Sequence, residues 1–230
     1  KGPGVRPDSE FIILAKKRGI PVLNDIAIFL DRCPAKIIGV SGSRGKSTTS
    51  FLIWKFLQEK FTVWLAGNIC KSVLELLPKI KAKDWVVLEL SSFQLQDLAD
   101  SGLEIKGKPE ISVLINIYKE HLNWHKNPDD YLKAKSYITT FQKKENYLFL
   151  NPSDEKLKNI AKISKAKIVF PKLPRNLQEI VDKNLGRHYG SSVALAVGVA
   201  NLLGINNEFV EKKLRSFYGL PGRQENIREV

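Results

Sequence analysis

The sequence predicts an α/β fold, with a mostly parallel sheet covered by helices on both faces. Short apolar runs rich in β-branched residues alternate along the chain with segments whose apolar residues recur at helical spacing. The links between these segments are short, and such an alternation is typical of parallel strands joined by helical crossovers. The sequence shows no internal repeat and no low-complexity tract, so one layered sheet is the expected architecture.

The helices are predicted from apolar residues at helical spacing and from the residues at their ends. Gly19 and Gly204 are suited to the left-handed conformation that ends a helix. Asn24 or Asp25 is suited to begin the second helix, because a short polar side chain can accept a backbone hydrogen bond there. The expected helices are 8–18, 24–32, 46–59, 72–77, 93–99, 128–143, 153–164, 191–203 and 208–216.

The strands are predicted from compact apolar runs between these helices. The runs at 37–40 and 85–90 are apolar almost throughout, as strands buried on both faces of a parallel sheet usually are. The expected strands are 20–23, 37–40, 61–66, 85–90, 111–117, 147–150 and 167–170.

The expected domain boundaries follow from where this alternation begins and ends. Residues 36–222 are expected to form the compact unit. Residues 1–35 are expected to be a linker or the tail of a preceding domain, and residues 223–230 the start of a further one. The chain contains no methionine and opens on a sequence typical of a loop, so we expect it to be a fragment of a longer protein.

Composition excludes several classes of protein. Hydrophobic residues make up 43% of the 230 residues and charged residues 27%, which excludes a collagen-like, coiled-coil or mainly disordered chain. No stretch approaches the roughly 18 consecutive apolar residues of a membrane span, and no signal segment opens the chain, so a cytoplasmic protein without a membrane partner is expected. Cys33 and Cys70 are too few for a disulfide framework or a four-cysteine zinc site.

The net charge of +13 favours an anionic partner: nucleic acid, an anionic membrane surface or a phosphorylated small molecule. The basic residues are spread along the chain, and arginines do not alternate with the aromatic residues that stack on bases. We therefore interpret most lysines as a solvated surface and expect no nucleic-acid partner.

A glycine-rich loop stands between the strand at 37–40 and the helix at 46–59, with the sequence Gly42-Ser43-Arg44-Gly45-Lys46-Ser47-Thr48. Glycines allow backbone N–H groups to point at phosphate oxygens, and the helix N-terminus adds a partial positive charge. Lys46 supplies a full charge, and the Ser47 hydroxyl is suited to bind Mg²⁺. The strict phosphate-loop pattern would place a glycine at Val40. The setting between strand and helix still favours a nucleoside triphosphate site over a tight turn with a surface lysine.

The loop resembles the phosphate loop of the Mur ligases, and further segments resemble that family in the same order along the chain. Glu89-Leu90-Ser91-Ser92-Phe93-Gln94-Leu95 resembles a segment of the family members that add D-glutamate. The other resembling segments are 2–22, Gly67-Asn68-Ile69, Asn116 with Glu120-His121-Leu122, Tyr131-Leu132-Lys133-Ala134-Lys135, and Gly219-Leu220-Pro221-Gly222-Arg223-Gln224-Glu225.

Three positions and one short stretch depart from the family's pattern. Arg44 replaces the asparagine of the family's loop, Glu120 replaces an aspartate, and Gly222 replaces a histidine. After His188, the residues 189–192 replace asparagines that help to hold adenine in the family. These departures bear on nucleotide binding.

The resemblance implies an ATP-dependent ligase, with this chain being chiefly its ATP-binding central domain. In the implied reaction ATP phosphorylates the carboxylate of UDP-N-acetylmuramoyl-L-alanine, the amine of D-glutamate attacks the acyl phosphate, and ADP and phosphate leave. The implied partners are therefore ATP, UDP-N-acetylmuramoyl-L-alanine and D-glutamate, with Mg²⁺, in a protein expected to be a monomer. The isolated chain is expected to bind nucleotide with little or no turnover.

The resemblance also implies the site residues. Those implied for ATP are Gly42, Ser43, Arg44, Gly45, Lys46, Ser47, Thr48, His188 and Arg223. Those implied for the substrate are Asn68, Ser91, Ser92, Gln94 and Asn116. Those implied for metal are Ser47, Glu89, His121 and, if carbamylated, Lys135. The expected catalytic residues are Lys46, Lys135 and His121.

Several of these residues also have a purely structural interpretation. Glu89 followed by two serines also suits a helix cap, and asparagines such as Asn116 also suit turns at strand ends. Lys135 would then be one of several lysines on a basic helix surface, and Arg223 a salt-bridge partner. His125, although four residues after His121, is expected to be an exposed histidine rather than a ligand.

Two other functions remain open. The first is another Mur ligase or a folylpolyglutamate synthase-like ligase, against which the segment 89–95 argues. The second is a degenerate phosphate-loop module that binds nucleotide without catalysis, an interpretation that the departures at Arg44 and after His188 keep open.

Overall fold

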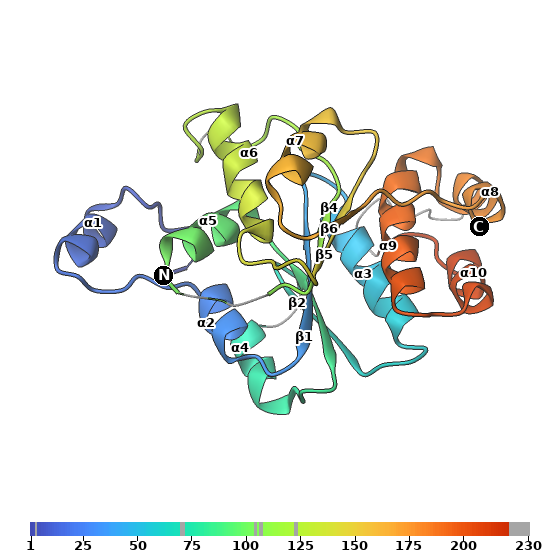
Figure 1. The fold of residues 1–230 in the computed structure, drawn as a ribbon, viewed down its shortest axis with the longest axis horizontal. Coiled ribbons are helices and arrows are strands. Elements are labelled where there is room, and N and C mark those ends of the chain that lie inside the picture. The colour runs from blue at the N-terminus through green and yellow to red at the C-terminus, as the bar shows by residue number, and fades with distance from the viewer. Residues whose placement is uncertain (3, 70–71, 104, 106–107, 122–123, 221–230) are drawn as a thin grey trace, which may run out of the picture.

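Six parallel strands form one sheet, in the order β2-β3-β1-β4-β5-β6 (Figure 1). The structure is a computed structural model that describes residues 1–2, 4–69, 72–103, 105, 108–121 and 124–220. The strands are β1 (Lys36–Ser41), β2 (Val63–Gly67), β3 (Trp85–Glu89), β4 (Ile111–Leu114), β5 (Tyr147–Leu150) and β6 (Lys167–Val169). The predicted α/β fold with a parallel sheet is confirmed.

Helices cover both faces of this sheet. One face carries α3 (Lys46–Leu57), α8 (Arg175–Asn184), α9 (Gly190–Leu202) and α10 (Asn207–Arg215). The other face carries α2 (Asp25–Arg32), α4 (Val73–Leu76), α5 (Ser92–Asp100), α6 (Pro128–Ser136) and α7 (Glu155–Ile163). Three short 3₁₀ segments within the described residues are η1 (Leu77–Lys79), η2 (Tyr137–Thr139) and η3 (Arg187–Tyr189).

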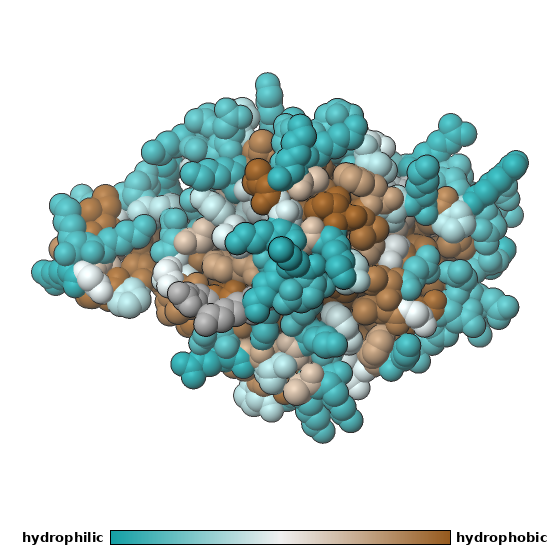
Figure 2. Space-filling view, viewed as in Figure 1, coloured by the Kyte–Doolittle hydropathy of each residue, from teal (hydrophilic) through white to brown (hydrophobic). Residues whose placement is uncertain are grey.

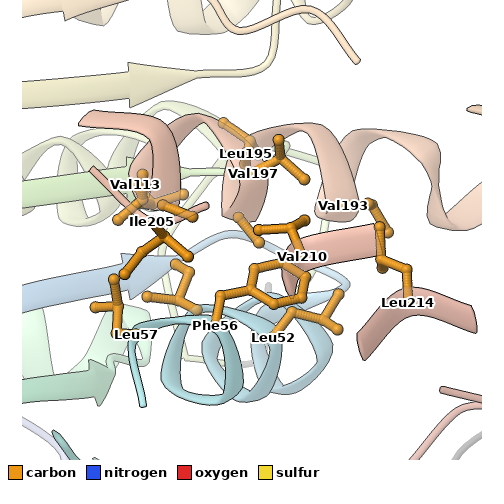
Figure 3. Packing of buried hydrophobic residues seen from close by; sticks show 14 of the residues in the cluster. Leu52, Phe56, Leu57, Val113, Val193, Leu195, Val197, Ile205, Val210 and Leu214 are labelled. Carbon is orange, nitrogen blue, oxygen red and sulfur yellow. The ribbon is translucent and has the colours of Figure 1, made fainter. Parts of the chain in front are cut away.

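Successive residues of each strand point to opposite faces, and two apolar cores result. Ile38 and Val40 of β1 lie in the core beneath α3 and α9, whereas Ile37 lies in the core beneath α2 and α5. Figure 3 shows apolar side chains of α3, α9 and α10 pointing into one shared cluster, which includes Phe56 and Val210. Fully burying a side chain of this kind stabilises the fold by about 1.5–3 kcal/mol, so these contacts fix the helices that flank the phosphate loop.

Two predicted elements differ clearly from the structure. The strand predicted at 20–23 is wrong, because this stretch pairs with no strand among the described residues and Pro21 has no N–H to donate. The helix predicted at 128–143 ends at Ser136 and continues only as η2. Tertiary contacts outweigh helix propensity there, since Ser112 of the sheet donates a hydrogen bond to the Ile138 carbonyl.

Helix α8 was not expected, although its pattern was present in the sequence. Its buried residues Leu177, Ile180 and Val181 follow the i, i+3, i+4 spacing of a helix with one apolar face. The two prolines in 171–174 favour a loop, but Pro174 stands at the position just before the helix, where it is tolerated.

Helix α1 (Glu10–Lys17) projects from the sheet and buries little of its surface (Figure 1). Phe11, Ile13 and Leu14 are exposed on it, and Figure 2 shows apolar surface among hydrophilic surface in this region. Helix α2, by contrast, packs its residues Ile26 and Phe29 into the same core as the sheet. None of the helices in the described part of the chain is long and apolar enough to cross a membrane.

The ends of β2 and β3 approach each other unusually closely at Gly67. This residue has φ 101°, and a Cβ placed there would lie 2.2 Å from the Glu89 carbonyl oxygen. The next residue, Asn68, donates its backbone N–H to the same carbonyl at 2.9 Å. The absence of a side chain at Gly67 therefore brings Asn68 next to Glu89, at the carboxyl edge of the sheet.

We predict that Gly67→Ala lowers the free energy of unfolding by about 3 kcal/mol or more, because the new methyl group would meet backbone atoms that cannot move aside. Gly102→Ala is the matched control, since Gly102 also has a left-handed φ of 70° but has no atom within 4 Å of an added Cβ. The control is expected to cost about 1 kcal/mol. Urea unfolding measures both, and equal losses would contradict the argument from close approach.

Candidate functional site

The phosphate loop joins β1 to α3, and its shape depends on contact with α9. Gly45 precedes the first residue of α3 and has φ 81°. A Cβ at Gly45 would lie 2.7 Å from the Ser192 hydroxyl oxygen, so only glycine allows α9 to approach the loop this closely. The loop is thus held between the N-termini of two helices, α3 and α9.

Two lysines from different elements converge on one carbonyl of this loop. The Lys46 ammonium donates to the carbonyls of Gly42, at 3.0 Å, and Ser43, at 2.6 Å. Lys135 of α6 donates to the same Gly42 carbonyl at 2.9 Å and to the Ser41 hydroxyl at 3.1 Å. The loop therefore carries two amines side by side at the end of β1.

Lys135 is buried, with only 2% of its surface exposed. Burial and the neighbouring positive charge of Lys46 hold the pKa of the Lys135 amine well below its ordinary value. The negative charges of Glu120 and Glu89 oppose this shift without cancelling it. The interpretation of Lys135 as a surface lysine is wrong, because the side chain is buried beneath the phosphate loop.

Glu89 ends β3 as a buried carboxylate, with 1% of its surface exposed. Its Oε1 accepts a hydrogen bond from the Asn68 side chain at 3.3 Å, and its Oε2 accepts none from the described residues. A buried carboxylate oxygen without a donor is costly unless a cation or water approaches it. The alternative interpretation of Glu89 as a helix cap is wrong, because Ser91 caps α5 instead.

Two cavities meet at Lys46. The first has a volume of about 620 Å³ and is lined by Ser43, Arg44, Gly45, Lys46, Ser47, Thr48, Asn116, Tyr118, His188, Tyr189 and Ser192. The second has a volume of about 530 Å³ and is lined by Gly4, Lys46, Asn68, Ser91, Ser92, Phe93, His121, Trp124 and Lys135. Most residues expected to bind ATP line the first cavity, and most of those expected to bind the substrate or a metal line the second.

Asn116 and Gln94 lie elsewhere than their expected substrate role suggests. Asn116 lines the first cavity, and its side chain bonds to both the N–H and the carbonyl of Arg44, at 2.9 and 3.2 Å. Gln94 is buried and lines neither cavity, since its Oε1 accepts from the Ser91 N–H and hydroxyl in a capping box. Both side chains therefore hold backbone in place in this structure.

His125 is not exposed, and the expectation that it would be is wrong. Only 4% of its surface is accessible, and its Nε2 lies 3.0 Å from the Ser92 hydroxyl. Its ring stacks on Phe93, with 5.7 Å between the ring centroids. Burial lowers the pKa of His125, and the nearby side chains of His121 and Lys135 lower it further.

His121 has a strained backbone on the wall of the second cavity. Its φ of 56° is the only left-handed value among the non-glycine residues that the structure describes. Such strain is retained where surrounding contacts over-determine it, often at functional sites. Its ring also packs edge-on against Phe93, with centroids 5.0 Å apart.

Comparison with known proteins identifies this arrangement. Residues 40–202 match the Mur ligase middle domain. The chain belongs to the Mur ligase family. The family resemblance predicted from the sequence motifs is confirmed, and the ligases of this family are ATP-dependent.

Curated Mur ligases resemble the chain along its whole length. It is 31% identical to the UDP-N-acetylmuramoylalanine–D-glutamate ligase of Enterococcus hirae, over 100% of this chain and 53% of that protein. It is 36% identical to the ligase of the same name from Thermosipho melanesiensis, over 99% of this chain and 53% of that protein. The chain thus spans about half the length of the curated relatives it matches.

A solved Mur ligase structure shows the same fold. The MurF ligase of Thermotoga maritima, solved in complex with ADP, superposes with a TM-score of 0.66 over 96% of this chain and 55% of that one. The sequences are 20% identical in that comparison, so it is the fold that they share.

Several residues of this Mur ligase site were given no role from the sequence. The Tyr131 hydroxyl lies 2.8 Å from the Ser43 hydroxyl, which in turn accepts from the Tyr118 N–H at 2.9 Å. Tyr131 precedes Lys135 by four residues on α6, and this spacing indicates that both side chains lie on the same face of the helix. Phe93 and Trp124, which line the second cavity, carried no signal beyond their apolar character. Arg223, expected to bind ATP, and Gly222 lie outside the described residues.

Magnesium fits the residues of this Mur ligase site. No group of three or more His, Cys, Asp or Glu side chains within the described ranges is arranged to hold a metal. Mg²⁺ in nucleotide sites commonly takes one or two protein ligands and completes its shell with phosphate oxygens and water. The Oε2 of Glu89, which accepts no hydrogen bond from the described residues, and the hydroxyl of Ser47 are oxygen ligands of the kind that Mg²⁺ takes.

Proposed function

We propose that the chain is the ATP-binding central part of a ligase that joins D-glutamate to UDP-N-acetylmuramoyl-L-alanine, forming ADP and phosphate. The observation that carries this proposal is the position of Lys46 between two cavities, one lined by the phosphate loop and the other by Lys135 and the segment that follows Glu89. The motif at 89–95 and the names of the curated relatives support the D-glutamate-adding branch.

The nucleotide would occupy the first cavity. Its phosphates would lie against the N-terminus of α3, where backbone N–H groups and the partial charge of the helix favour anions. Lys46 would exchange its bonds to the loop carbonyls for bonds to the β- and γ-phosphates. The base would lie toward His188 and Tyr189, at the far side of the same cavity.

The muramoyl substrate would approach from the second cavity, with its carboxylate near Lys46. One carboxylate oxygen attacks the γ-phosphorus, the bond to the β-phosphate oxygen breaks, and ADP leaves. The amine of D-glutamate then attacks the acyl carbon, the phosphate departs with its oxygen, and the amine loses a proton. The first step brings two anions together, so it depends on positioning and on neutralising cations such as Lys46.

Glu89 and Ser47 would hold Mg²⁺, which supplies charge neutralisation at the phosphates when bound. His121 and a carbamylated Lys135 would serve a second ion from the wall of the second cavity. Carbamylation needs a neutral amine to attack carbon dioxide with loss of a proton, and the environment of Lys135 favours that neutral form. The product is an anion, which removes a positive charge that would otherwise repel a metal.

The rest of the catalytic apparatus would come from the parts of the protein that flank this chain. Residues 1–35, of which α2 packs into the core of the sheet, and residues 223–230 would connect the central domain to those parts. We propose that the complete ligase is a cytoplasmic monomer and that this chain by itself binds ATP with little turnover.

We predict that Lys46→Ala weakens binding of ATP with Mg²⁺ by about 10- to 100-fold, because a charge-assisted bond to phosphate is lost. Isothermal titration of the chain measures this, and Lys133→Ala, which removes an exposed lysine of α6, is the control. In the full-length protein, phosphate release should require both UDP-N-acetylmuramoyl-L-alanine and D-glutamate. The proposal would be contradicted if the parent chain bound no ATP, or if the full-length protein released phosphate only with an amino acid other than D-glutamate.

We also predict a carbamate on Lys135. With ¹³C-labelled bicarbonate near neutral pH, the parent chain should give a carbamate carbonyl signal by NMR that acidification removes. Lys135→Met should abolish the signal, whereas Lys133→Met should retain it, because Lys133 is exposed two residues away on the same helix. Identical spectra from the parent and Lys135→Met would contradict the assignment.

A further inference from the structure

Arg44 places a cation at the phosphate loop. Its backbone is held in place by hydrogen bonds, whereas its guanidinium is exposed. The Asn116 side chain clamps the Arg44 peptide from both sides, through its N–H and its carbonyl. The Arg44 side chain, however, is 79% exposed and lines the same cavity as Lys46. The backbone of this residue is thus held at the loop, while its guanidinium has room to reorient.

Among the residues that the structure describes, Glu120 is the acidic partner of the Arg44 guanidinium. Its Nε donates to the Glu120 carboxylate at 3.3 Å, and its central carbon lies 5.9 Å from the centre of the Tyr118 ring. An ion pair this exposed contributes little to stability in water. A polyphosphate offers several charged oxygens in a geometry that suits the fork of a guanidinium better.

We propose that Arg44 and Glu120 form an exchangeable pair: Arg44 is a second phosphate-binding cation, which leaves Glu120 for a phosphate oxygen when the nucleotide binds. The inference rests on the proposed binding of ATP in the first cavity. Without nucleotide, Glu120 holds the arginine beside the site.

The chain offers a closely matched control pair. On α8, far along the chain from the phosphate loop, Arg175 Nε donates to Glu179 Oε1 at the same distance of 3.3 Å, and both side chains are exposed. This second pair reports what the loss of a surface arginine–glutamate contact does when no phosphate is near.

The experiment is isothermal titration of the chain with ATP and with ADP in the presence of Mg²⁺. Arg44→Gln should weaken the binding of ATP and of ADP by roughly tenfold, as expected when a charge-assisted hydrogen bond is lost. Glu120→Gln should tighten both by about two- to threefold, because the competitor for Arg44 is gone. In the double variant Arg44→Gln/Glu120→Gln, the tighter binding produced by Glu120→Gln should disappear. The control variants Arg175→Gln and Glu179→Gln should bind ATP and ADP as tightly as the parent chain does. Melting curves with unchanged midpoints establish that each variant is folded.

Two results would overturn the inference. One is an Arg44→Gln chain that binds ATP as tightly as the parent while Lys46→Ala does not, in which case the proposed function stands and the exchange fails. The other is equal weakening by Arg44→Gln and Glu120→Gln, which would make the pair a fixed structural contact. If the parent chain binds no ATP, the proposed function fails, and the inference fails with it.

Discussion

Burial of charge at the carboxyl edge of the sheet is the constraint on which the rest of the site depends. Lys46 and Lys135 both donate to the Gly42 carbonyl, and Glu89 is buried with one carboxylate oxygen that accepts no hydrogen bond from the described residues. Unbalanced buried charges are expensive, so the protein either neutralises Lys135 or recruits ions of both signs. An anionic polyphosphate and a divalent cation would together satisfy all three residues, and the close approach at Gly67 keeps Glu89 and Asn68 in place for them.

The phosphate loop could be predicted from the sequence because its chemistry is local. Lys46 and Ser47 follow a glycine turn between a strand and a helix, and that order alone indicates phosphate binding. The parallel sheet could also be predicted, because strand-like runs alternate along the chain with segments of helical periodicity. The resemblance to Mur ligases supplied Lys135 and His121, whose proximity to the loop depends on long-range packing that periodicity does not report.

What the sequence did not predict depends on tertiary contacts. The burial of His125 results from its hydrogen bond to Ser92 and its stacking on Phe93, both of which belong to helix α5. The run at 20–23 has strand-like residues but pairs with no strand among the described residues. The helix predicted at 128–143 ends at Ser136, just before Ile138, whose carbonyl accepts a hydrogen bond from Ser112 of the sheet. Gln94 looked like a ligand in its motif, yet its side chain is used to cap α5.

The central claim is that Lys46 and Glu89 meet around a magnesium-bound triphosphate. A crystal structure of the chain with Mg²⁺ and a non-hydrolysable ATP analogue tests it most directly. The account predicts Lys46 on the terminal phosphates and a metal ion that reaches both Ser47 and Oε2 of Glu89. A nucleotide bound elsewhere, or bound at the loop with Glu89 still lacking any cation, would contradict the account.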